Sequence, residues 1–274
     1  MKVVAVVQAR LGSIRLPEKV LRPIANKPMI EILLNRLSMS SEIDEILVAT
    51  SNKEENDKLQ SFVEALDFRC TRGSEEDVLS RFYDTARSSE ADIVVRITGD
   101  CPLVDPGLVD KCIKGYKQNE VDYFSNIQPT TFPDGLDIEV LSMHSLEKAH
   151  KEAISNYDRE HVTTYIRNSD KFSKCSIKNS KDLSEQRWSV DEPEDLELIT
   201  KIFEHFSPDI YFSWNRVVEL IELKPDLFKL NQFIKNNEGS AMGTGQKLYK
   251  RAKRVISGGN MLLSKRPEMF LPEQ

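Results

Sequence analysis

Three cations and a glycine lie close together in one loop near the start of the chain. The loop follows Val3–Val7, an apolar and β-branched run that predicts a strand buried on both faces. Its cations are Arg10, Arg15 and Lys19, and Gly12 lets backbone N–H groups approach an anion closely. Such a loop could neutralise a triphosphate. A solvated surface turn has the same composition, so the residue chemistry alone leaves both interpretations open.

Two aspartates far apart in the sequence are candidate metal ligands. Asp100 follows the apolar run 92–98, and Asp191 precedes a segment whose Asp195 we expect to be the acid at a helix start. Mg²⁺ binds one or two carboxylates together with phosphate oxygens, so the pair would hold it on a nucleotide. Each residue also has an ordinary structural explanation, which is a turn after glycine for Asp100 and a helix N-cap for Asp191.

Apolar runs alternate with amphipathic segments along the chain. The expected strands cover residues 3–7, 43–50, 68–70, 92–98, 122–126, 136–141 and 172–177. The expected helices cover residues 28–37, 54–66, 77–88, 142–154, 158–168, 214–223 and 226–234, with another that begins at 192. This order predicts an α/β fold with a Rossmann-like, doubly wound and mostly parallel sheet, followed by a smaller, less regular α+β subregion. Functional loops should lie at the carboxyl ends of the strands.

The bulk composition excludes several classes of protein. The chain has 274 residues, a net charge of −6 and no apolar run of membrane-spanning length, which argues against nucleic acid and membrane partners. Four cysteines without a Cys-x-x-Cys pair favour reduced thiols and a cytoplasmic location. Composition changes near residue 236, so we expect one catalytic domain over 1–235 and a linker with a basic tail over 236–274.

The run Val7–Leu21 resembles the opening of the cytidylyltransferases that make CMP-activated sugars. It is most similar to the spore-coat polysaccharide (SpsF-like) branch, and more distantly to CMP-sialic acid and CMP-Kdo synthetases. The resemblance extends over about residues 1–235 and implies a nucleotidyltransferase, GT-A-like fold. It implies a Mg²⁺-dependent homodimer that couples CTP to an acidic 3-deoxy-2-keto acid sugar, releasing pyrophosphate, for surface polysaccharide or lipopolysaccharide biosynthesis.

The same resemblance assigns roles residue by residue. Arg10, Lys19 and Asp100 are the expected catalytic residues, and Asp100 and Asp191 are the expected Mg²⁺ ligands. The expected nucleotide contacts are Gln8, Ala9, Arg10, Leu11, Gly12, Ser13, Arg15, Lys19, Ser51, Asn52, Arg72, Ser80 and Asp100. The expected acceptor contacts are Asp134, Gly135, Asp137, Glu139, Arg159 and His161.

Several of these residues have structural alternatives. Arg72 matches the segment that reads the cytosine ring, but it could instead pair with Glu75 or Glu76. Asp137 and Glu139 could lie on the exposed face of a strand, and His161 could be structural.

Alternatives also remain for the tail and for the function. The segment Leu248–Asn260 resembles the lead-in of class III, pyridoxal-phosphate-dependent aminotransferases, so the tail would begin a second domain; otherwise it is a solvated basic tail. Other functions compatible with the motifs are a nucleotidyltransferase of this fold that uses another nucleotide or a sugar 1-phosphate, a GT-A glycosyltransferase, and a nucleotide-sensing scaffold.

Overall fold

The computed structural model describes residues 1–234, and Met1–Phe233 form one compact unit. The expected linker, basic tail and aminotransferase-like segment lie outside the described residues. Within residues 1–234, no helix is both long enough and apolar enough to cross a membrane.

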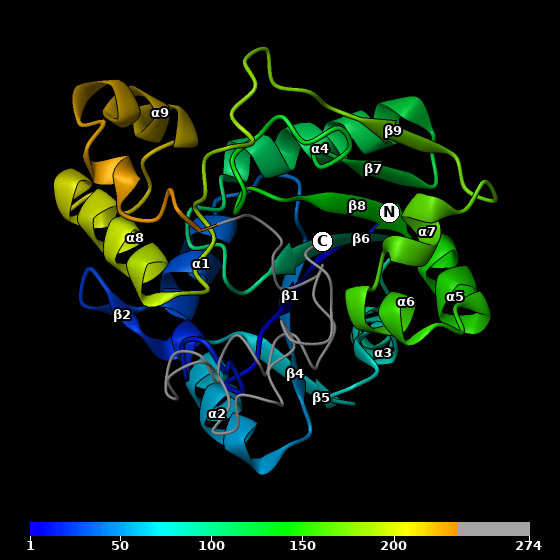
Figure 1. The fold of residues 1–274 in the computed structure, drawn as a ribbon. Coiled ribbons are helices and arrows are strands. Elements are labelled where there is room, and N and C mark those ends of the chain that lie inside the picture. The colour runs from blue at the N-terminus through cyan, green and yellow to red at the C-terminus, as the bar shows by residue number, and fades with distance from the viewer. Residues whose placement is uncertain (235–274) are drawn as a thin grey trace, which may run out of the picture. The chain divides into compact units, whose positions relative to one another are not determined.

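A seven-stranded sheet in the order β5-β4-β1-β6-β8-β7-β9 forms the centre of the fold (Figure 1). Only β8 runs antiparallel to its neighbours β6 and β7, while the other pairings are parallel, so the prediction of a mostly parallel sheet is confirmed. The strands of this sheet are β1 (Val3–Gln8), β4 (Glu45–Ser51), β5 (Arg69–Gly73), β6 (Ile93–Thr98), β7 (Tyr123–Ser125), β8 (Glu139–Ser142) and β9 (Lys174–Ser176). A separate ribbon pairs β2 (Pro23–Ile24) with β3 (Lys27–Pro28).

Helices cover both faces of the sheet. Val3, Ala5 and Val7 belong to one buried cluster, which includes side chains of α1, α2, α4, α8 and α9. Val4 and Val6 belong to a second cluster with side chains of α3, α5 and α7. The helices are α1 (Met29–Leu37), α2 (Asp57–Ala65), α3 (Val78–Ser88), α4 (Pro106–Asn119), α5 (Met143–Glu152), α6 (Asn156–His161), α7 (Thr164–Asn168), α8 (Pro193–Phe206) and α9 (Trp214–Leu223), with 3₁₀ turns η1 (Lys19–Leu21), η2 (Glu54–Asn56) and η3 (Leu227–Lys229).

Three features differ from the sequence-based expectations. The helix expected over 158–168 is broken into α6 and α7 at Val162, which adopts a φ of 61° and is fully buried. The helix expected over 226–234 is only the short turn η3. Helix α4 was not among the expected elements, although Asp105 caps it through the Leu108 N–H (2.9 Å) and Pro106 stands in its first turn.

Candidate active site

Strands β1 and β6 bring the cationic loop and the Asp100 loop together at their carboxyl ends. The Gly99 N–H donates to the Gln8 carbonyl at 2.8 Å. A Cβ at position 99 would lie 2.8 Å from the Cβ of Ala9 and 2.9 Å from the Gln8 carbonyl oxygen, so this close approach requires glycine. The two loops therefore share one edge of the sheet, as expected for a ligand site in an open α/β fold.

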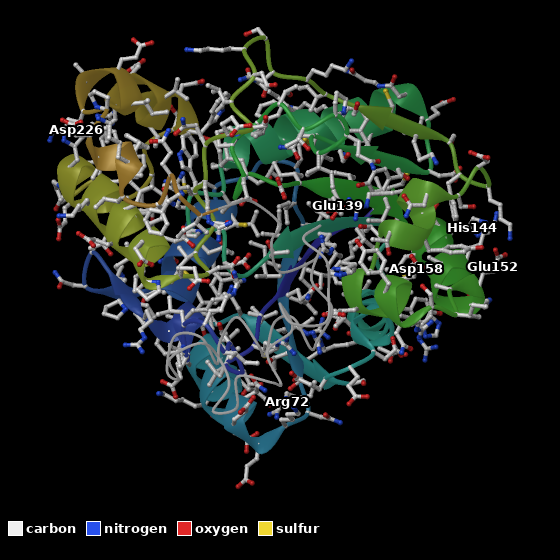
Figure 2. The ribbon with its side chains drawn as sticks, in the orientation of Figure 1. Arg72, Glu139, His144, Glu152, Asp158 and Asp226 are labelled. Atoms are coloured by element: carbon white, nitrogen blue, oxygen red, sulfur yellow. The ribbon has the colours of Figure 1, made fainter. Side chains whose placement is uncertain are left out.

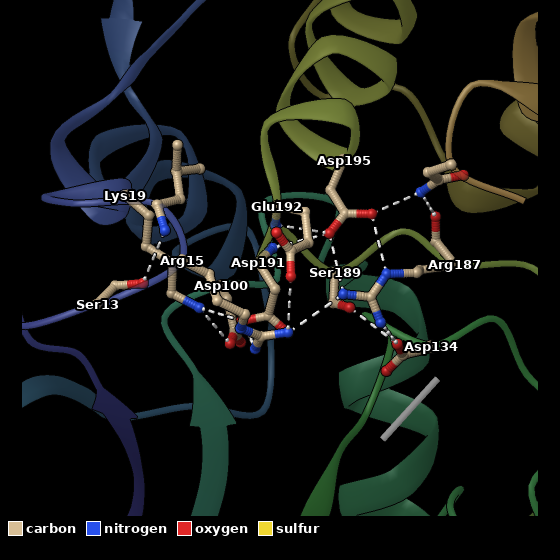
Figure 3. Close-up of polar contacts among 12 residues, drawn as sticks. Ser13, Arg15, Lys19, Asp100, Asp134, Arg187, Ser189, Asp191, Glu192 and Asp195 are labelled. Carbon is tan, nitrogen blue, oxygen red and sulfur yellow. Dashed lines mark hydrogen bonds and ion pairs between the residues drawn. The ribbon is translucent and has the colours of Figure 1, made fainter. Parts of the chain in front are cut away.

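Lys19 lies between the two aspartates predicted to bind metal (Figure 3). Its Nζ donates to Asp100 Oδ2 at 2.9 Å and to Asp191 Oδ1 at 2.7 Å. Burial lowers the pKa of Lys19, but the two carboxylates outweigh burial and the net shift is upward. Burial raises the pKa of Asp100, but Lys19 outweighs it and holds that pKa well below its usual range. At neutral pH Lys19 is thus an ammonium bound to the ionised carboxylate of Asp100.

Arg15 joins this cluster from the same loop. Its guanidinium lies 2.9 Å from Asp191 Oδ1 and 3.5 Å from a carboxylate oxygen of Glu192. Glu192, and not Asp191, is the N-cap of α8, where it forms a capping box with Asp195. The helix-cap alternative for Asp191 is therefore wrong, while the prediction that Asp195 is the acid at the helix start is confirmed.

A buried arginine that the sequence analysis did not identify holds the acids of the site in place. Arg187 makes a bidentate pair with Asp195, with both nitrogen–oxygen distances at 2.9 Å. The same guanidinium lies 3.3 Å from Asp191 Oδ2 and 3.4 Å from Asp134 Oδ2. Its side chain is 4% exposed and that of Asp195 is 0% exposed, so this pair is shielded from solvent. Arg187 thereby connects a predicted metal ligand, a predicted acceptor contact and the start of α8.

Gly135 allows the Asp134 segment to pack directly against residues 188 and 189. The Trp188 N–H donates to the Asp134 carbonyl at 2.7 Å, and Ser189 Oγ donates to Asp134 Oδ2 at 2.8 Å. Gly135 has a φ of +103°, and a Cβ there would lie 2.6 Å from the Ser189 nitrogen. Both the φ and the contact exclude an ordinary side chain.

Replacing Gly135 with alanine should therefore lower the free energy of unfolding by more than about 1 kcal/mol. Urea denaturation of the full chain followed by circular dichroism measures this change. Gly107→Ala is the control, since a Cβ at that helical position meets only the Asp105 side chain at 3.2 Å. Equal stability of the two variants would contradict the requirement for glycine at 135.

The remaining cations and polar groups of the first loop also have protein partners. Arg10 pairs with Glu75, and the Leu11 N–H donates to Asn56 Oδ1 at 2.8 Å. Ser13 Oγ accepts from the Leu16 N–H at 3.4 Å. A Cβ on Gly12 would lie 2.7 Å from a Glu55 carboxylate oxygen, while Ala9 is buried. Acidic side chains thus neutralise the positive charge of the loop, which argues against the interpretation of a simple solvated turn.

Gln8 ends β1 with a polar atom that lacks a partner. Its side-chain Oε1 is buried and accepts no hydrogen bond within the described part of the chain. A buried acceptor without a hydrogen-bond donor is uncommon in proteins. The position of Gln8 beside Gly99 is consistent with the predicted nucleotide contact.

Arg72 lies on β5 beside α2 (Figure 2), and its guanidinium donates hydrogen bonds to neighbouring protein groups. Its Nε donates to the Ser51 carbonyl at 2.6 Å and Nη2 donates to the Lys53 carbonyl at 2.7 Å. Nη1 donates to Asp57 at 2.7 Å and to Gln60 at 2.9 Å. The alternative pairing with Glu75 or Glu76 is wrong because Asp57 is the acidic partner. Reading of cytosine by Arg72 stays a prediction, with most donors of this guanidinium already used.

Other predicted nucleotide contacts lie near the same strand ends. Ser51 is buried, and its hydroxyl accepts from Asn56 Nδ2 at 2.8 Å. The Asn52 N–H donates to the Gly73 carbonyl at 2.7 Å, while its side chain is exposed. Ser80 Oγ lies 3.3 Å from His150 Nε2. Ser51 adjoins the cationic loop through Asn56, which also accepts from the Leu11 N–H.

The predicted acceptor contacts fall into different environments. Glu139 is 2% exposed, pairs with Arg96 and accepts from the Tyr123 hydroxyl, so the exposed-strand alternative is wrong for Glu139. Arg159 pairs with Asp77 at the start of α3, with its Nε 2.9 Å from Asp77 Oδ1. His161 ends α6 and packs against the Tyr157 ring. Only Asp134 of this set contacts Arg187, and acceptor binding by all six residues stays a prediction.

The carboxylates of this site can bind a hard cation that takes only a few of its ligands from the protein. In residues 1–234, no three His, Cys, Asp or Glu side chains gather closely enough to hold a metal by themselves. Asp100 and Asp191 nevertheless both contact one cation, the Lys19 ammonium, so their carboxylates can face a common positive charge. Two carboxylates with the remaining positions left to water and phosphate match the way Mg²⁺ binds beside nucleotides.

Comparison with known proteins identifies the family. A cytidylyltransferase family model matches residues 4–226. The chain belongs to the cytidylyltransferase family. The resemblance of the opening motif and the expected enzyme class are thus confirmed.

Similar proteins cover nearly all of the described chain. This cytidylyltransferase is 35% identical to an uncharacterised protein of Methanocaldococcus jannaschii, over 86% of this chain and 96% of that protein. It is 32% identical to the spore coat polysaccharide biosynthesis protein SpsF of Bacillus subtilis, over 81% of this chain and 94% of that protein. A cytidylyltransferase structure from Leptospira borgpetersenii matches with a TM-score of 0.81 and 32% identity, covering 86% of this chain and 100% of that one.

More distant relatives share less of the chain. The 3-deoxy-manno-octulosonate cytidylyltransferase of Pelobacter propionicus is 34% identical over 42% of this chain and 44% of that protein. A solved CMP-2-keto-3-deoxy-manno-octonic acid synthetase, described as complexed with CTP, has a TM-score of 0.58 and 19% identity, covering 75% of this chain and all of that one. That likeness shows the fold, and it confirms the nucleotidyltransferase type of α/β architecture.

Proposed function

We propose that this cytidylyltransferase transfers CMP from CTP to an acidic 3-deoxy-2-keto acid sugar, releases pyrophosphate, and supplies surface polysaccharide or lipopolysaccharide biosynthesis. The observation that carries the proposal is the meeting of Lys19 with Asp100 and Asp191 at the carboxyl edge of the sheet. SpsF acts in spore coat polysaccharide biosynthesis, and the Pelobacter propionicus relative is a 3-deoxy-manno-octulosonate cytidylyltransferase. The first name supports a role in polysaccharide biosynthesis, and the second supports a keto-acid sugar as the acceptor.

The site residues would divide the work between charge and position. Arg10, Arg15 and Lys19 would exchange their carboxylate partners for the phosphates of CTP, because a triphosphate competes well for guanidinium and ammonium groups. Asp100 and Asp191 would hold Mg²⁺, and Arg187 positions the Asp191 carboxylate. The bound ion would neutralise charge that develops on the phosphate oxygens. The sugar hydroxyl attacks the α-phosphorus in line with the departing pyrophosphate, so positioning and electrostatics dominate the catalysis.

A screen of pyrophosphate release tests this function. The full chain is incubated with Mg²⁺, each of the four ribonucleoside triphosphates, and a set of 3-deoxy-2-keto acid sugars or sugar 1-phosphates. We expect release only with CTP and at least one keto-acid sugar. Release that requires a sugar 1-phosphate or another nucleotide would replace the acceptor or base assignment, and loss of all activity without Mg²⁺ is expected. The homodimer, the cytoplasmic location and an aminotransferase domain in the same chain stay predictions.

A further inference from the structure

Asp137 lies at the same edge of the sheet as Asp100. In the antiparallel pairing of β8 with β6, Glu139 lies opposite Arg96. The pairing ends there, and Asp137 comes two residues before β8 (Glu139–Ser142), at the end of the sheet where β6 finishes at Thr98. Thr98 in turn lies opposite Gln8 at the end of β1. Asp137 therefore belongs to the same row of strand ends from which the two catalytic loops begin.

The backbone around Asp137 is fixed by its neighbours. Leu136 and Ile138 are fully buried in the core. Asn126 binds both of them, donating from Nδ2 to the Leu136 carbonyl at 2.7 Å and accepting from the Ile138 N–H at 2.8 Å. Because the side chains of an extended segment alternate, Asp137 points away from this apolar cluster and toward the face of Glu139. Residue 137 as a whole is half-buried, and burial is the largest influence on the pKa of its carboxyl.

Asp137 differs from the surrounding acids because no protein group binds its carboxyl. Asp100 and Asp191 bind Lys19, Asp134 binds Ser189 and Arg187, and Glu139 binds Arg96 and Tyr123. Within residues 1–234, Asp137 makes neither a hydrogen bond nor an ion pair. A carboxyl without a protein partner at this edge of the sheet is free to accept a proton from a ligand.

The charges around Asp137 favour proton uptake near neutral pH. Burial raises the pKa of Asp137, and Asp134, Glu139 and Asp100 raise it further. Arg96 opposes them, and the pKa reaches about 7. Cys101 also faces this carboxyl, and burial raises the pKa of its thiol well above its usual range, so the thiol stays neutral.

We propose that Asp137 is the general base that takes the proton from the attacking hydroxyl of the acceptor sugar. The proposal rests on the proposed function. As the sugar oxygen bonds to the α-phosphorus, the bond from that phosphorus to the β-phosphate's bridging oxygen breaks. The proton of the hydroxyl moves to the Asp137 carboxylate, and pyrophosphate leaves with the electron pair of the broken bond. No oxidant or reductant takes part, and the carboxyl returns its proton to solvent before the next turnover.

The kinetic test compares Asp137→Asn with Asp84→Asn in the full chain. Asp84 is an exposed residue of α3, so its variant controls for the loss of one carboxylate. We expect Asp137→Asn to lower kcat at least about 100-fold, and the control to leave it unchanged. In the wild type kcat should rise with pH through about 7 as the base loses its proton, and this limb should vanish in Asp137→Asn. Wild-type kcat with an unchanged pH profile in Asp137→Asn would overturn the proposal.

A second measurement needs no acceptor and separates this inference from the proposed function. Infrared difference spectra of the free protein, recorded between pH 5 and 9, follow the carboxyl stretch of protonated acids. We expect one carboxyl to titrate near neutral pH in the wild type and in Asp84→Asn, and to be missing in Asp137→Asn. If the same titration persists in Asp137→Asn, the inference is overturned. Wild-type protein that shows this titration but makes no CMP-sugar would overturn the proposed function and, with it, the role of Asp137 as the base for a sugar hydroxyl.

Discussion

Substitution of Lys19 with methionine is expected to lower kcat for pyrophosphate release about 1,000-fold. Methionine keeps most of the length of the side chain but removes the ammonium that binds Asp100 and Asp191 at 2.9 and 2.7 Å. In the proposed reaction that ammonium neutralises the phosphates, so the loss should fall on kcat more than on KM for the sugar.

The same substitution should tighten metal binding in the absence of nucleotide. Lys19 competes with a divalent ion for both carboxyl groups, so its removal leaves both available to bind the metal. Electron paramagnetic resonance with Mn²⁺ measures the affinity directly. Thermal unfolding should also show a lower Tm without metal and a larger rise on adding Mg²⁺ than the wild type shows.

Lys58→Met is the matched control for this experiment. Lys58 is exposed and pairs with Glu18 at the surface, so its loss should change neither kcat nor Mn²⁺ affinity. Weaker Mn²⁺ binding in Lys19→Met than in the wild type would contradict the view that the lysine and the metal share the two carboxylates.

The strands of the fold were easier to predict than its irregular segments. Val3–Val7 is apolar at every position, and the structure buries it between two helical layers. The break at Val162 could not be predicted, because a β-branched residue rarely adopts a positive φ and tertiary packing of its side chain imposes it here. The exposed-strand alternative fails for Glu139, which is buried in an ion pair with Arg96 of the adjacent strand, a contact that the local sequence does not reveal.

The centre of the site was predictable, and the residues that support it were not. Asp100 and Asp191 are separated by ninety residues, but each follows a recognisable motif, and both meet Lys19 in the structure. Arg187 has no motif of its own, and its partner Asp134 lies far earlier in the sequence. The only local signal is the spacing of four residues to Asp191, which many unrelated arginines share.

A second large effect is expected in Arg187→Gln, which should lower the free energy of unfolding by about 3–5 kcal/mol. The substitution removes the bidentate partner of Asp195 and leaves that fully buried carboxylate without compensating charge. A loss of this size is a large part of the stability of an ordinary domain. Guanidinium denaturation of the full chain measures it, with Lys229→Met as a control because Lys229 and Asp226 are an exposed pair.

The loss of unfolding free energy in Arg187→Gln should depend on pH in a defined direction. Burial raises the pKa of Asp195, but hydrogen bonds from Arg187 and Asn231 outweigh it and lower the pKa overall. The wild type therefore gains stability from this group above the pKa of the unfolded chain and loses it as the pH falls. In Arg187→Gln the carboxyl should become harder to ionise, so the variant should lose most stability relative to wild type above about pH 5 and less near pH 4. A deficit that stays constant over this range would show that Arg187 acts through packing alone.

Arg187→Lys separates the charge of this residue from its geometry. A lysine keeps the positive charge near Asp195 but cannot form the bidentate pair and reach Asp134 and Asp191 at once. We expect it to recover more than half of the lost stability while binding Mn²⁺ more weakly than the wild type, since Asp191 loses one of the groups that orient it. Full recovery of both stability and Mn²⁺ affinity would mean that the arginine contributes only charge, and that the position of Asp191 is set by Lys19 and Arg15 alone.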